Sequence, residues 1–172
     1  MRIFISTLVV VLFAAISTRS ETIEGRWKLI SAEDLRDDGS VGQYPWGRHP
    51  VGWIVVERGW CLLQIMSTDV PSFSSTGKPE GEKPVGDQKP VGDQMKDALI
   101  KNYIGYEGPC TIDEKQGSLT MNIDAAWRPD YPGSQQKRFF HFENGKLIFG
   151  MAPDAIHTPN GNFTRKLTLE RP

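Results

Sequence analysis

Apolar and polar positions alternate along most of this chain in short runs, a pattern typical of β-strands with one buried face. β-Branched and aromatic residues are concentrated in these runs, and glycine, proline, asparagine and aspartate separate them. The expected strands cover residues 24–35, 51–57, 60–66, 106–113, 118–127, 136–142, 146–151 and 163–170. Regular spacing with one late helix predicts an all-β fold, an eight-stranded antiparallel up-and-down barrel.

The first strand carries the residues around which the barrel is expected to form. It begins with a Gly-x-Trp pattern, Gly25 and Trp27, in which Trp27 shares one face of the strand with Leu29. We expect Trp27 to plug one end of a small closed barrel. A barrel plugged at one end is expected to have an open mouth at the other.

Composition changes between residues 67 and 94, where proline, glycine, serine, lysine and aspartate dominate. Residues 83–88 and 89–94 are identical copies of the hexapeptide KPVGDQ. Two copies are too few for a solenoid and contain nothing that packs a core, so we predict a long flexible surface loop. A role of this loop in binding a partner protein is a further hypothesis, which rests on the loop alone.

A short helix is expected directly after the loop, from Met95 to Tyr103. Met95, Ala98, Leu99 and Tyr103 recur at helical spacing. The helix either caps the barrel mouth or packs on the outer wall, and the sequence leaves both positions open.

The amino terminus has the features of a secretory signal peptide. Arg2 precedes an almost wholly apolar run from Ile3 to Ile16, after which small and polar residues follow. A membrane-spanning helix needs roughly 18 apolar residues, so we predict a signal peptide over residues 1–20 rather than the alternative, a retained anchor. Residues 21–172 then form one domain with no integral membrane segment. We expect it to be secreted or in the secretory-pathway lumen, or periplasmic in a bacterium.

The charge of the chain argues against nucleic acid as a partner. The formal net charge is −1, and cleavage after residue 20 takes away Arg2 and Arg19 but no acidic residue, which leaves −3. A weakly acidic body without a basic stripe is not suited to bind nucleic acid or an anionic membrane surface.

Two features depend on this secretory route. Cys61 and Cys110 are the two cysteines of the chain, and in an oxidising compartment an even count favours a disulfide, with two buried free thiols as the alternative. Asn162 begins the sequence Asn162-Phe163-Thr164 and would be glycosylated only in a eukaryotic secretory pathway.

Several motifs together resemble a known family. The Gly25-x-Trp27 pattern resembles the first-strand signature of lipocalins and the wider calycin group. Four further motifs, in this order along the chain, resemble the small lipocalin-like domain family of fungi and bacteria. They are Gly47-x-x-Pro50-Val51-Gly52, Tyr103-Ile104-Gly105-Tyr106-x-Gly108, Pro129-x-Tyr131-x-Gly133 and Arg138-Phe139. The resemblance implies a β-barrel with an internal cavity for a small hydrophobic or amphipathic molecule.

The resemblance also implies structural roles near the plugged end. Lipocalins commonly place an arginine of the last strand over the first-strand tryptophan, and Arg171 or Arg165 could stack on Trp27 in this way. Gly25, Trp27 and Arg171 are therefore expected to be structural residues.

Candidate ligand-binding residues come from position and from alternation. Large amphipathic or flexible side chains near strand ends or the expected helix suit a mostly apolar site, and residues on the apolar faces of later strands point inward as core or as cavity lining. The candidates are Trp53, Met66, Tyr103, Tyr106, Met121, Trp127 and Phe149.

The ionisable residues predict no metal and no cofactor. The three histidines, His49, His141 and His157, are scattered without metal-ligand spacing. His141 is expected on the surface if its neighbours Phe140 and Phe142 face the interior. No hydrolase, nucleotide-triphosphatase or dinucleotide-binding motif is present.

Two functional hypotheses follow. The first is a secreted, non-catalytic protein that binds a small hydrophobic molecule in its barrel. The alternative, brought in by the resemblance, is a metal-free cyclase or isomerase acting on a hydrophobic intermediate of secondary-metabolite biosynthesis, polyketide or terpenoid. Such an enzyme would need shape and a few polar anchors, for which the candidates are Tyr103, Tyr106, Asp124 and Arg138.

Overall fold

The structure is a computed structural model that describes residues 21–70, 97–98, 100–152, 156–158 and 161–172. The predicted signal peptide, the duplicated hexapeptide and three residues of the expected helix, Met95, Lys96 and Leu99, lie outside the described residues.

The described chain consists mainly of strands. They are β1 (Gly25–Leu35), β2 (Val41–Gln43), β3 (Val51–Glu57), β4 (Trp60–Met66), β5 (Tyr103–Asp113), β6 (Ser118–Asn122), β7 (Ala125–Ala126), β8 (Gln135–Glu143), β9 (Lys146–Gly150), β10 (Ile156–Thr158) and β11 (Gly161–Glu170). Residues 97–98 and 100–102 are helical. Within the described part of the chain, no helix has the length and apolar character needed to cross a membrane.

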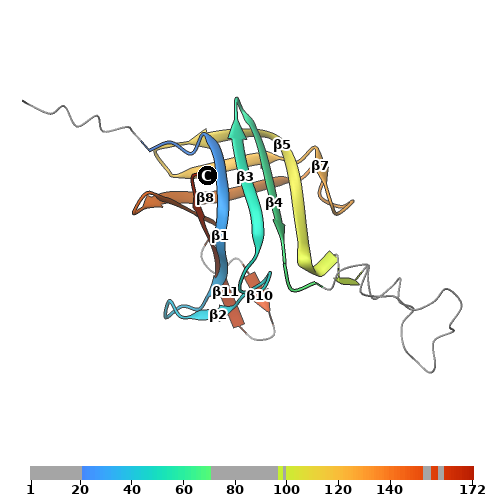
Figure 1. Cartoon of the computed structure of the whole chain (residues 1–172). Helices are drawn as coiled ribbons and strands as arrows, with labels where there is room; N and C mark the ends of the chain where they lie inside the picture. Colours follow the sequence, from blue (N-terminus) through green and yellow to red (C-terminus); the bar gives the residue numbers. More distant parts are fainter. Residues whose placement is uncertain (1–20, 71–96, 99, 153–155, 159–160) are drawn as a thin grey trace, which may run out of the picture.

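Eight strands form a closed antiparallel barrel, in the order β1, β3, β4, β5, β6, β8, β9 and β11 (Figure 1). Each strand pairs with its neighbour along the chain, and β11 pairs with β1 to close the sheet on itself. The short strands β2, β7 and β10 pair with β1, β5 and β11 respectively. The predicted up-and-down barrel is confirmed.

One predicted strand is divided in two. Residues 118–127 were expected to be continuous, but the chain bends at Ile123 and Asp124 between β6 and β7. Gly108 of β5 makes room for this bend. The carbonyl group of Asn122 occupies the position that a Cβ atom of residue 108 would take. The Asp124 N–H then donates to the Glu107 carbonyl at 2.9 Å, which reconnects the chain to β5.

A β-bulge changes which residues of β1 face the interior. Trp27 and Leu29 point inward, as their alternation predicts. The register against β11 then shifts between Leu29 and Ser31. A bulge adds one residue to one strand and so reverses the alternation beyond it. Ala32 and Asp34 are therefore buried inside the barrel.

One end of the barrel is closed by Trp27 and Arg171. The Arg171 guanidinium carbon lies 3.9 Å from the centroid of the Trp27 ring, and its Nη2 donates to the Thr22 carbonyl at 2.8 Å. The indole N–H of Trp27 donates to the Ile23 carbonyl at 2.8 Å. Gly25 has a φ of +112°, and a Cβ there would collide with the Arg171 guanidinium. The Gly-x-Trp pattern thus makes room for the arginine that covers the tryptophan.

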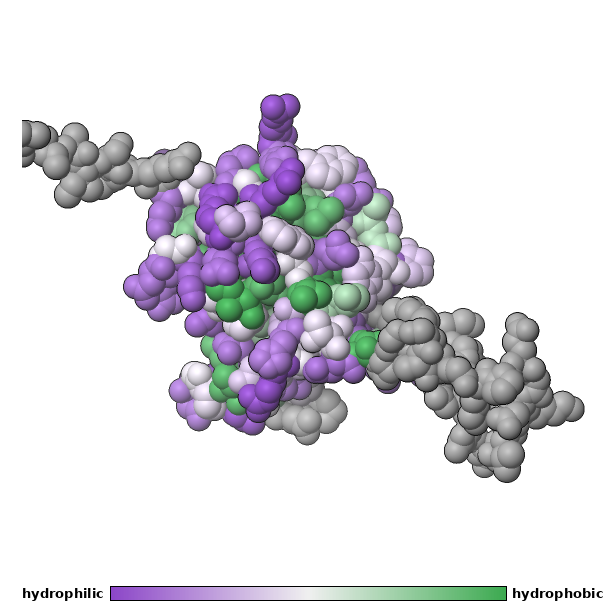
Figure 2. Space-filling view, in the orientation of Figure 1, coloured by the Kyte–Doolittle hydropathy of each residue, from purple (hydrophilic) through white to green (hydrophobic). Residues whose placement is uncertain are grey.

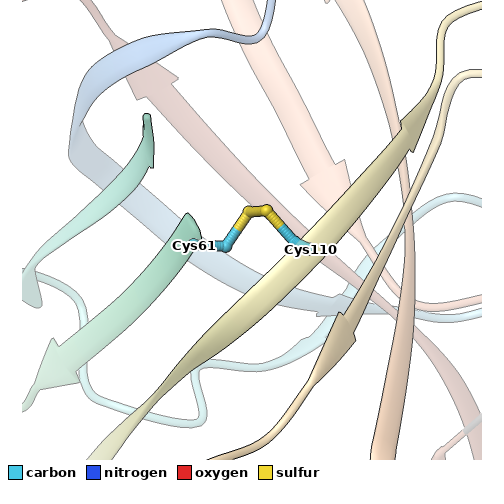
Figure 3. Close-up of a disulfide and its surroundings, with 2 residues drawn as sticks. All are labelled: Cys61 and Cys110. Carbon is cyan, nitrogen blue, oxygen red and sulfur yellow. A yellow bond between two sulfur atoms is a disulfide. The ribbon is translucent and has the colours of Figure 1, made fainter. Parts of the chain in front are cut away.

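A disulfide joins neighbouring strands near this end. Cys61 of β4 and Cys110 of β5 are both buried and are bonded to each other, with their Cα atoms 5.7 Å apart (Figure 3). The two positions lie two residues apart in register, since Cys61 is opposite Gly108. The alternative of two free thiols is therefore not what the structure shows.

Removal of the disulfide is expected to weaken the fold. The cysteines are 49 positions apart in the sequence, and loss of such a cross-link destabilises by up to about 4 kcal/mol because the unfolded chain gains freedom. The double substitution Cys61→Ser with Cys110→Ser should lower the free energy of unfolding in urea by about 2–4 kcal/mol. Wild-type protein unfolded in reductant serves as the control and should match the variant. A variant as stable as the oxidised wild type would contradict the expectation.

Candidate functional site

A pocket lies inside the barrel, toward the end opposite Trp27. Four polar or amphipathic side chains line it, Trp46, Tyr106, Arg138 and Arg165, and we call this the polar end. The apolar lining comes from Leu63, Ile65, Ile104, Phe149, Met151 and Leu167. The site therefore combines an apolar wall with a few convergent polar groups, which is the usual composition of a small-molecule site.

Arg165 is held by a buried carboxylate. Its Nε and Nη2 donate to the two carboxylate oxygens of Asp34 at 2.7 and 2.8 Å, and Gln43 Nε2 donates to the same carboxylate at 2.8 Å. The Asp34 side chain is fully buried, whereas that of Arg165 is 21% exposed. The Arg165 guanidinium lies 4.7 Å from the centroid of the Trp46 ring. The buried Asp34 carboxylate therefore accepts three hydrogen bonds, as a buried charge requires.

Arg138 has a different environment. Its Nη2 donates to the Tyr106 hydroxyl oxygen at 3.1 Å and to Gln136 Oε1 at 3.0 Å, and its Nη1 donates to the Lys137 carbonyl at 2.8 Å. All three acceptors are neutral. Among the described residues no carboxylate lies within 4.0 Å of this guanidinium.

Alternation along β8 places Arg138 inside. Phe140 is buried and packs edge-on against Phe142, whose ring lies 5.8 Å from that of Trp27. Arg138 is on the same face of the strand, two residues earlier, and half-buried. His141, between the two phenylalanines, is exposed, as the sequence predicts.

Burial keeps Tyr106 in its neutral form. Its side chain is 4% exposed, and desolvation raises its pKa above the ordinary 10.0, although the nearby Arg138 charge acts in the opposite direction. Tyr131 packs against it with ring centroids 6.1 Å apart, and Trp127 packs edge-on against Tyr131 at 4.9 Å. Because the Tyr106 oxygen accepts from Arg138, its own proton can be donated to another group.

The pocket is small in this conformation. Its volume is about 30 Å³, which is enough for water but far below the roughly 300–1,000 Å³ of a site for a small organic ligand. Arg138 and Met151 line it with long unbranched side chains that can change rotamer. A ligand can enter only if such side chains move.

One hollow larger than the interior pocket, of about 500 Å³, lies at the β5–β6 hairpin around Asp113, Glu114 and Lys115, and two others lie on the outer wall. One, of about 330 Å³, is lined by Phe139, His141 and Ile148 among others, and another, of about 300 Å³, by Tyr103, Glu107 and Trp127 among others. Both lie between outward-facing side chains and are open to solvent. Neither gathers a set of buried polar groups like that of the interior pocket.

Some of the ligand-binding candidates from the sequence lie inside the barrel and others lie on its outer wall. Tyr106 and Phe149 line the interior pocket. Met121 is buried in the core at 2% exposure but does not line the pocket. Trp127 packs on Tyr131 and borders the outer hollow, and its indole nitrogen is buried without a hydrogen-bond partner in the structure.

Three of the ligand-binding candidates lie on the outer wall and not at the interior pocket. Trp53 and Met66 are 39% and 45% exposed, because Ile54 and Ile65 beside them take the inward positions. Tyr103 is also on the outer wall, where its ring lies over Gly105. Figure 2 shows hydrophobic residues (green) reaching the surface over the wall formed by β1, β3 and β4.

The candidate glycosylation site and the histidines lie on the surface. Asn162 is exposed at the start of β11, where its amide oxygen lies 2.9 Å from His157 Nδ1. All three histidines are exposed. In the part of the chain that the structure describes, no group of three or more histidine, cysteine, aspartate or glutamate side chains could hold a metal ion.

Sequence reasoning missed several residues of the polar end. Trp46 lies in a loop rich in proline and glycine, where the sequence predicts no buried residue. In the structure it is 6% exposed and its ring lies against the Arg165 guanidinium. Asp34 was missed because nothing in the local sequence pattern indicates the bulge that turns its side chain inward. Arg138 was considered only as a polar anchor, without a partner.

Comparison with known proteins agrees with this architecture. A closed antiparallel barrel with one sealed end and an apolar interior pocket is a small-molecule-binding fold. The model of the lipocalin-like domain matches residues 24–171, and the chain belongs to this family. Searches of curated proteins and of solved structures found no match.

The raised pKa of Tyr106 predicts a late tyrosinate titration. The difference between the ultraviolet absorbance titrations of the wild type and Tyr106→Phe isolates this residue, and its midpoint should lie above 10.0. Because folding favours the neutral phenol, this stabilisation is complete below pH 10 and is lost as the pH rises through the raised pKa. A midpoint at or below the ordinary value would contradict burial of the phenol.

Proposed function

We propose that the chain binds a small, largely apolar molecule in the interior pocket at the polar end of the barrel. The observation that carries the proposal is the lining of this pocket. Apolar side chains from several strands surround it, and among the described residues the polar groups that reach it are those of Tyr106, Arg138, Arg165 and Trp46. Membership of the lipocalin-like domain family supports the same conclusion.

Binding on this proposal includes a rearrangement of the pocket. The present volume of about 30 Å³ accommodates no organic ligand. Met151 follows the end of β9 and is half-buried, so it can swing outward without loss of a strand hydrogen bond. The ligand would then take the place of the methionine against Ile104 and Phe149.

We also propose that the protein is exported. Support comes from the apolar leader over residues 1–20 and from the Cys61–Cys110 disulfide, since such bonds persist in oxidising compartments. On a eukaryotic route, the exposed Asn162 would be accessible for glycosylation.

Filling the pocket is expected to prevent binding. Met151→Trp introduces a bulky ring into the pocket lining and should weaken binding of a neutral apolar dye such as Nile red by about tenfold or more, measured by dye fluorescence. Met66→Trp is the matched control, because Met66 is 45% exposed on the outer wall. The control should bind the dye as the wild type does.

The outcome separates interior from surface binding. Equal dye affinities of Met151→Trp and the wild type would show that the interior pocket is not the site. A loss confined to Met66→Trp would move the site to the outer wall of β3 and β4.

A cyclase or isomerase is the second candidate, and one observation favours it. Of its four polar candidates, Tyr106 and Arg138 meet inside the barrel at 3.1 Å, where both can donate hydrogen bonds to a bound carbonyl. Asp124 is exposed, and Tyr103 is on the outer wall. Deletion of the gene with metabolite profiling of the host tests this candidate, since an unchanged product profile would rule it out.

A further inference from the structure

The polar end holds more positive than negative charge. Arg165 and Asp34 neutralise each other through two hydrogen bonds. Arg138 faces the same pocket, where the hydrogen-bond acceptors described above are neutral, and none of the described residues that line the pocket is acidic. The described residues around the pocket therefore carry one cationic group without a charged partner.

The position of this charge is unfavourable unless something offsets it. Arg138 is half-buried, beside the almost fully buried Tyr106 and opposite Leu119 of β6. A charged group in an apolar environment is normally paired, because its interaction with water is weakened there. An anion bound beside the guanidinium would supply the missing partner.

The donors at this position match a carboxylate. The guanidinium of Arg138 presents planar N–H groups, which suit the two oxygens of a carboxylate. The hydroxyl of Tyr106 accepts from Arg138 at 3.1 Å and keeps its proton because burial raises its pKa, so it can donate to the same anion. Arg165 is not the anchor, since Asp34 already occupies its Nε and Nη2 groups.

We propose that the ligand is an apolar molecule with one carboxylate, and that Arg138 and Tyr106 bind its head group. This inference rests on the proposed function, because it identifies the ligand class of the same pocket. A cationic ligand would be repelled by Arg138, and a ligand without a polar head would leave the guanidinium unpaired. The apolar body then lies against the wall of Ile104, Phe149 and Met151.

Three probes that differ only in the head group test the proposal. Decanoate, decanol and decylamine have the same chain length and can be titrated below their critical micelle concentrations by isothermal titration calorimetry at neutral pH. The wild type should bind decanoate at least about tenfold more tightly than decanol, and decylamine more weakly than decanol.

Two variants locate the head group. Arg138→Gln should raise the Kd of decanoate by about 10- to 100-fold, and Tyr106→Phe by about tenfold, whereas the Kd of decanol, whose neutral hydroxyl makes only a weak hydrogen bond with these groups, should rise by less than about threefold in either variant. Retained decanol binding also shows that the pocket remains folded. Lys146→Gln removes one exposed charge at the opposite end of the barrel and should change none of the affinities.

The outcomes distinguish this inference from the proposed function. Equal affinities of the wild type for decanoate and decanol would overturn the carboxylate proposal and leave an interior site for neutral ligands. Loss of decanoate affinity by the same factor in Lys146→Gln would also overturn it, since the preference would then reflect net charge. Absence of binding for all three probes would overturn both the inference and the proposed function.

Discussion

The pairing of the first strand with the last is the constraint on which the rest of this barrel depends. β1 and β11 run antiparallel from Lys28 opposite Glu170 to Leu35 opposite Thr164, and this ladder closes the sheet. β11 also brings one arginine to each end of the barrel interior. Arg171, directly after β11, covers Trp27 at the closed end, and Arg165, within β11, binds Asp34 at the polar end. The same strand pair therefore seals one end of the interior and supplies the buried ion pair of the other.

Closure also sets the chemistry of the interior. A closed barrel has no exposed sheet edge, so inward side chains are shielded from water by a continuous wall. This shielding raises the pKa of Tyr106 and strengthens the hydrogen bonds between Asp34 and Arg165. It also makes the half-buried charge of Arg138 unfavourable without a partner. The proposed preference for a carboxylate is thus a consequence of the fold as much as of one arginine.

Much of the fold, but only part of the site, could be predicted from the sequence. β3 and β4 have the predicted bounds, because their hairpin has a strong apolar pattern and a tight turn at Gly59. Phe149 faces the interior, as the alternation along its strand predicts. Trp53 and Met66 are ligand-binding candidates in the sequence because they lie near strand ends, but alternation beside Ile54 and Ile65 turns both side chains toward the outer wall.

Local sequence therefore determined most of the barrel strands and their turns, the barrel class and the tryptophan of the closed end, since each follows from residue preferences over a few positions. Tertiary structure alone decided which polar residues share the interior. Asp34 faces inward only because a bulge between Leu29 and Ser31 reverses the alternation of β1, and Arg165 meets it only because β11 pairs there in this register. The physical reason is that the face of a strand residue depends on register and bulges, which arise when distant strands pair.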